Sequence, residues 1–98
     1  MIIKDLLAQL ETVAHPLAKA IHKGEHFKVL AIAFKKGMIL KEHRTQLAAK
    51  LTVLSGAVVY KEGMVEKTLL QYHETDIPVN VVHSVEALED SLCLLTQG

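Results

Sequence analysis

The sequence predicts one compact all-β barrel preceded by a short helix. From Leu17 onward, short runs of apolar and β-branched residues alternate with turns rich in glycine and charge, a spacing typical of all-β barrels. An amphipathic stretch before residue 15 supplies the helix. The rival fold is an α+β sandwich, in which helices at both ends of the chain pack on an antiparallel sheet. We expect a single domain over residues 1–98, with the helix in 1–14 and the barrel in 17–98.

The first ten residues carry the pattern of an amphipathic helix of about three turns. Apolar side chains recur at three- and four-residue steps, with polar and charged residues between them. These apolar positions are Ile2, Ile3, Leu6, Leu7 and Leu10. His15 and Pro16 then break the pattern. We expect this helix to close one end of the core or to form a dimer seam.

Short strands are expected along most of the remaining chain. Residues 27–34 (FKVLAIAF) are nearly all apolar after the first lysine, as in a strand buried on both faces. Further strands are expected over 38–42, 47–54, 57–60 and 64–72. Residues 84–92 fit two patterns, a helix or two short strands about a turn at 89–91, and both stay open.

The composition limits both the location and the partners of the protein. Eleven basic side chains balance eleven acidic ones, and phosphate affinity comes mainly from clustered lysine and arginine, so we expect no nucleic-acid partner. The one cysteine, Cys93, lies in an apolar run and is expected to be a small core residue. A chain without a disulfide fits a reducing cytoplasm. No window approaches the roughly 20 apolar residues that span a bilayer, and we expect a soluble cytoplasmic protein.

Glycine and histidine recur at a distinctive spacing in the middle of the chain. Five residues separate Gly37 from His43, and twelve separate His43 from Gly56. This spacing resembles the first motif of the cupin family, whose members are small double-stranded β-helix (jelly-roll) barrels. The motif runs Gly, five residues, His, one, His, three or four, Glu, six, Gly. Thr45 stands in place of the second histidine, and Ala49 in place of the glutamate.

A second cupin motif is also partly matched, and the resemblance covers most of the chain beyond the first two dozen residues. The motif runs Gly, five residues, Pro, one, Gly, two, His, three, Asn. The corresponding residues here are Tyr72, Pro78, Asn80, His83 and Ala87. Asn80 is a sensible substitute for glycine, because asparagine tolerates the left-handed backbone conformation better than most residues.

The resemblance implies a metal site of which only part is present. In metal-binding cupins, three histidines and one glutamate hold a divalent ion, and this chain keeps His43 and His83. At the carboxylate position, strand alternation places Ala49 on one face with Leu51 and Val53, so that wall is expected to be apolar. We expect either no cofactor or a weakly held divalent metal (Fe, Mn, Ni or Zn) on the two histidines.

Three functions are consistent with these residues. The favoured one is a cupin-fold homodimer that binds an unknown small molecule in a pocket lined by His43, Thr45, Gln46, Ala49 and His83, without a full metal site. The second is a metal-dependent enzyme, similar to a dioxygenase or an isomerase, with His43 and His83 as ligands. The third is a structural or partner-binding dimer module whose own side chains fill the pocket. No catalytic residue is assigned.

Overall fold

The computed structural model describes the backbone of residues 1–98 and every side chain except that of His43. Over this described chain, one helix is followed by nine strands. Their bounds are α1 Ile2–Leu10, β1 Leu17–Lys23, β2 Lys28–Phe34, β3 Ile39–His43, β4 Ala49–Ser55, β5 Val58–Glu62, β6 Val65–Leu69, β7 Glu74–Ile77, β8 His83–Ala87 and β9 Ser91–Gln97.

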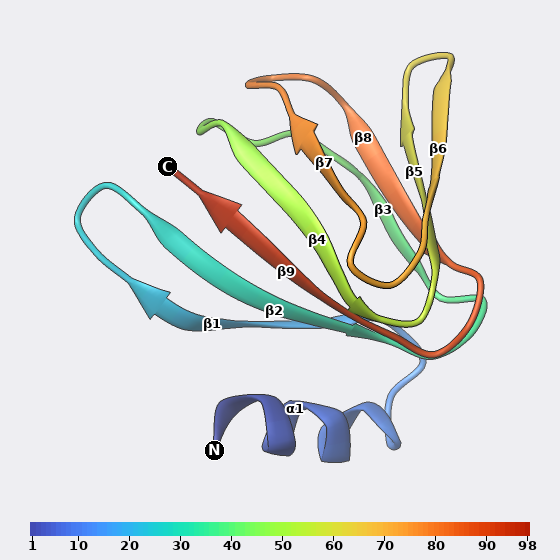
Figure 1. Cartoon of the computed structure of the whole chain (residues 1–98). Helices are drawn as coiled ribbons and strands as arrows, with labels where there is room; N and C mark the ends of the chain where they lie inside the picture. Colours follow the sequence, from blue (N-terminus) through green and yellow to red (C-terminus); the bar gives the residue numbers. More distant parts are fainter.

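The strands form two antiparallel sheets that face each other as a jelly-roll sandwich (Figure 1). One sheet has five strands in the order β1-β2-β9-β4-β7, and the other has four in the order β3-β8-β5-β6. The prediction of an all-β jelly roll is therefore confirmed. The two sheets do not close into a barrel, because the described backbone shows no ladder between the edge strands of one sheet and those of the other.

The ambiguity over residues 84–92 is resolved in favour of strands. β8 and β9 are separated by a turn over 88–90, close to the turn that the sequence suggested. Helical periodicity does not prevail because β9 is an inner strand with ladders to both β2 and β4, and these cross-strand hydrogen bonds outweigh local preference. The α+β alternative is therefore wrong.

The N-terminal helix packs on the outer face of the five-stranded sheet, below β1 and β2 in Figure 1. Leu6 and Leu10 are buried against Ala31 and Ala33 of β2. The expectation that the helix closes one end of the core is wrong. The small alanine side chains explain this position, because they let the helix approach the sheet closely. They also give β2 an apolar residue on both faces, as its unbroken hydrophobic run predicted.

The main core lies between the two sheets. Its largest fully buried side chains include Phe34, Ile32 and Leu51 from the five-stranded sheet, and Tyr60 from β5 in the four-stranded sheet. Cys93 is fully buried in this core, as predicted, and its burial raises the pKa of the thiol to about 12.

The glycine positions of the two motifs fall on tight turns. Gly37 and Gly56 have φ of 86° and 87°, and Tyr72 and Asn80 have φ of 69° and 61°. All four residues are in the left-handed region that glycine adopts most easily. Asn80 thus has the conformation expected of it, and Tyr72 adopts it despite its bulky side chain.

Candidate functional site

The pairing of β3 with β8 brings the two motif histidines opposite each other in the backbone. His43 and His83 are Cα partners in the ladder, just after a register shift that follows Leu40. The side chain of His43 lies outside the described residues, so the prediction that the two imidazoles share one cavity stays a prediction.

His83 is held firmly inside the sandwich. Its side chain is 2% exposed, and its Nδ1 lies 3.1 Å from the carbonyl oxygen of Val81. Because a carbonyl oxygen can only accept, Nδ1 carries the hydrogen and donates it. When the imidazole is neutral, Nε2 is then the nitrogen with the lone pair, as in a histidine oriented to accept a hydrogen bond or bind a metal.

A tyrosine and a glutamate, which sequence reasoning did not select, neighbour His83. The ring of Tyr60 lies 5.8 Å from the imidazole, centroid to centroid, and its hydroxyl donates to Oε1 of Glu62 at 2.7 Å. Burial and this bond to Glu62 both raise the pKa of Tyr60. Glu62 is the Cα partner of His83 across the β5–β8 ladder. A register between strands so distant in sequence leaves no local signal that could have revealed the pairing.

The wall around Ala49 is apolar. Ala49, Leu51 and Val53 are all buried in the core between the sheets, while Lys50 is exposed and lies 3.5 Å from Asp76. The motif position for a carboxylate therefore lies in a hydrophobic environment.

Thr45 and Gln46 lie in the loop between β3 and β4. Thr45 is buried, and its hydroxyl donates to the carbonyl oxygen of Leu47 at 2.8 Å. Gln46 is exposed. Both residues line a pocket of about 430 Å³ at the opening between the sheets, a volume within the range of small-molecule sites.

Aliphatic side chains and one small residue of β1 line the pocket. Its aliphatic floor comes from Leu30, Ile32, Leu40 and Leu95. Ala18 of β1, the Cα partner of Ile32, leaves the space that a larger residue would fill. Ala49 and His83 are not among the described residues that line this pocket, so the structure brings together only part of the predicted pocket set.

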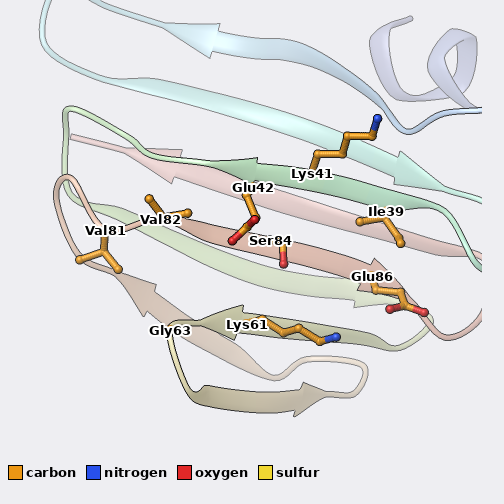
Figure 2. A pocket seen from close by; sticks show the side chains of 9 residues that line it. All are labelled: Ile39, Lys41, Glu42, Lys61, Gly63, Val81, Val82, Ser84 and Glu86. Atoms are coloured by element: carbon orange, nitrogen blue, oxygen red, sulfur yellow. The ribbon is translucent and has the colours of Figure 1, made fainter.

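A larger hollow, of about 750 Å³, lies on the outer face of the four-stranded sheet. Figure 2 shows Glu42, Ser84 and Lys61 arranged across β3, β8 and β5 on that face. Both lysines and glutamates line it. None of the predicted site residues whose side chains are described lies in this lining. We therefore regard the smaller pocket as the candidate functional site.

The residues do not fit the full metal site of the motif. No group of three or more histidine, cysteine, aspartate or glutamate side chains that could hold a metal ion occurs among the described side chains. Thr45 and Ala49 supply neither an imidazole nor a carboxylate at the two altered positions, and zinc and iron prefer those ligands.

Solved structures resemble this chain over most of its length. A cupin superfamily protein from Desulfitobacterium hafniense is 14% identical, with a TM-score of 0.80 over 87% of this chain and 80% of that one. An RmlC-like cupin from Desulfovibrio desulfuricans is 24% identical, with a TM-score of 0.77 over 84% of this chain and 80% of that one. A cupin-2 domain containing protein from Shewanella frigidimarina, 14% identical, has a TM-score of 0.76 over 99% of this chain and 92% of that one.

The chain has the cupin fold. The resemblance noted in the two motifs is thus confirmed at the level of the fold, and identities this low show nothing finer. No family model matches the sequence, and no curated protein matches it either. Within the described part of this cupin-fold chain, no helix is long and apolar enough to cross a membrane.

Proposed function

We propose that this cupin-fold protein binds a small organic molecule in the pocket between β1, β2, β9 and the β3–β4 loop. The observation that carries the proposal is the pocket of about 430 Å³ that includes Thr45 and Gln46. Its apolar floor supplies a favourable surface for burial of a ligand. Its polar rim, which includes Gln46 and Gln97, supplies groups that fix the ligand's orientation.

A fragment screen tests this proposal. Ligand binding to the native state raises its apparent stability by mass action, so some fragments should raise the melting temperature of the wild-type protein. Ala18→Phe should abolish these shifts by filling the pocket. The matched control is Ala8→Phe, an exposed helix position that should leave them intact. Equal shifts in both variants would place the binding elsewhere and reject the proposal.

The second candidate is a metal-dependent cupin enzyme, and one observation favours it. His83 is oriented by the Val81 carbonyl and has His43 and Glu62 as Cα partners on the two neighbouring strands. Elemental analysis after anaerobic incubation with Fe, Mn, Ni or Zn separates the two functions. If the protein is a metal-dependent enzyme, the wild type should contain near-stoichiometric metal, and both His43→Ala and His83→Ala should contain none. The organic-ligand proposal requires fragment binding that is unchanged by chelators.

The structural-module alternative has its own test. In it the chain's own side chains fill the pocket, and the apolar core that includes Tyr60, Leu51 and Val53 serves the fold alone. It predicts that no fragment changes the melting temperature. The homodimer and the cytoplasmic location belong to the proposal as well.

A further inference from the structure

We propose that the ligand of this pocket is a small amphipathic carboxylate, with an aliphatic or aromatic body and one anionic end. This inference rests on the proposed function and gives it a ligand class. Three features of the pocket support it: the positive charges at the rim, the aliphatic floor, and the N–H donors of Arg44.

The charged side chains that line the pocket are both cations. Lys28 stands at the start of β2, and Arg44 in the loop after β3. The described lining contains no aspartate or glutamate. Glu25, the acidic residue in the β1–β2 turn, lines an adjoining hollow and lies 3.8 Å from His26. A protein of zero formal net charge therefore has a locally positive pocket rim.

Strand pairing adds to this positive potential. Lys28 is the Cα partner of Lys23 across the β1–β2 ladder, and like charges placed opposite each other are mutually unfavourable. A bound anion relieves that repulsion. Arg44 can also offer two parallel N–H donors to a carboxylate, a geometry that favours this group over a single-point acceptor.

The floor of the pocket determines the rest of the ligand. Leu30, Ile32, Leu40 and Leu95 present only hydrocarbon, and burying an apolar group against them contributes about 25 cal/mol per Å². A bare inorganic anion has no apolar group to bury and cannot gain this free energy. A sugar would bury hydroxyl groups there without hydrogen-bond partners, which is costly. The combination of cationic rim and aliphatic floor thus selects an amphipathic anion.

Hexanoate and hexanamide provide a matched pair of probes, since they differ only in the charged end. Titration into ¹⁵N-labelled protein should show hexanoate binding at least tenfold more tightly than hexanamide, with shifts at Lys28, the 44–47 loop and Gln97. Inorganic phosphate, which has no apolar body, should bind more weakly than hexanoate. Added salt should weaken hexanoate binding because the rim cations are exposed.

Charge-removing variants complete the test. Arg44→Gln and Lys28→Gln should each weaken hexanoate binding about tenfold, while Lys36→Gln, which removes the same charge away from the pocket, should leave it unchanged. Equal affinity for hexanoate and hexanamide, with no effect of Arg44→Gln, would overturn the anion inference and leave small-molecule binding intact. The proposed function fails together with the inference under two conditions. Neither probe binds, and no fragment raises the melting temperature in a way that Ala18→Phe abolishes.

Discussion

Gly56 lies where the turn before β5 passes the turn before β9. A Cβ built at Gly56 would meet the backbone oxygen of Asp90 at 2.3 Å and the Cα of Ser91 at 2.8 Å. The buried hydroxyl of Ser91 stabilises this contact between the two turns, because it accepts a hydrogen bond from the backbone N–H of Ala57 at 3.1 Å. The position thus requires glycine for space as well as for its left-handed backbone.

Gly56→Ala should lower the free energy of unfolding by about 2–4 kcal/mol, since it adds a clash to the left-handed backbone penalty. Gly37→Ala is the matched control, because its φ is 86° and a Cβ there would meet nothing within 4 Å. It should cost only about 1–2 kcal/mol. Urea denaturation measures both values. Equal losses of stability in the two variants would show that the backbone around Gly56 shifts to accommodate a methyl group.

Cys93 should make the protein less stable in alkali. Its pKa is raised to about 12 by burial, while a thiol in the unfolded chain titrates near 8.5. The unfolded state therefore loses its proton first, and the stability present below about pH 8.5 is lost progressively as pH rises toward 12. Between pH 8 and pH 10, wild type should lose about 1–2 kcal/mol more than Cys93→Ala. Urea titrations at the two pH values measure these free energies of unfolding. An equal loss of stability in wild type and Cys93→Ala would contradict this account.

Residue identity predicted some local conformations and missed others, for physical reasons. Asn80 was expected in a left-handed turn and adopts one, because its short polar side chain tolerates that backbone. Tyr72 adopts the same conformation at a φ of 69°, and its side chain gives no such signal. The pairing of Glu62 with His83 depends on tertiary register, which single residues do not encode.

Strand β2 is where the layers of the molecule meet. Its Ile32 and Phe34 face the core between the sheets, while Ala31 and Ala33 face the helix. The hydrophobic run predicted a strand buried on both faces. It could not show that a helix covers one of them, because apolar periodicity reports burial and not the identity of the neighbour.

Leu6→Ala should test how far the helix stabilises the sheet. Leu6 is 2% exposed against β2, and removing a buried leucine side chain costs about 2–5 kcal/mol, most where the neighbours cannot collapse into the space. Leu88→Ala, at a turn position 43% exposed, is the control and should cost less than about 1 kcal/mol. Thermal and urea unfolding give both values. A small loss for Leu6→Ala would mean that the helix contributes little to the fold.

At the scale of the whole molecule, each sheet ends in two strands that pair with one neighbour only within the described backbone, β1 and β7 in one sheet and β3 and β6 in the other. Edge strands carry unpaired backbone groups and are commonly covered by a partner. On the helix, Ile2 and Leu7 remain 37% and 42% exposed, and Leu7 borders a groove of about 300 Å³ beside Leu92. The apolar surface that the sequence offered for a dimer seam is thus partly used within the chain and partly left outside.

The protein should sediment as a homodimer, with twice the 10.8 kDa of one chain. Leu7→Glu should dissociate it, because a carboxylate buried in the seam is costly. Leu70→Glu, which changes a side chain that is 50% exposed on another surface, should not. Analytical ultracentrifugation gives the masses. A wild-type monomer, or a dimer indifferent to Leu7→Glu, would show that the helix face is not the seam.

The turns at Gly37, Gly56, Tyr72 and Asn80 have a consequence for how proteins of this kind are recognised. What these positions share is a backbone angle, and only two of them share a residue type. Two chains can therefore follow the same path through space while their sequences, compared letter by letter, look unrelated. At these four turns a comparison of backbone angles finds one repeated feature, whereas a comparison of residue types finds only the two glycines.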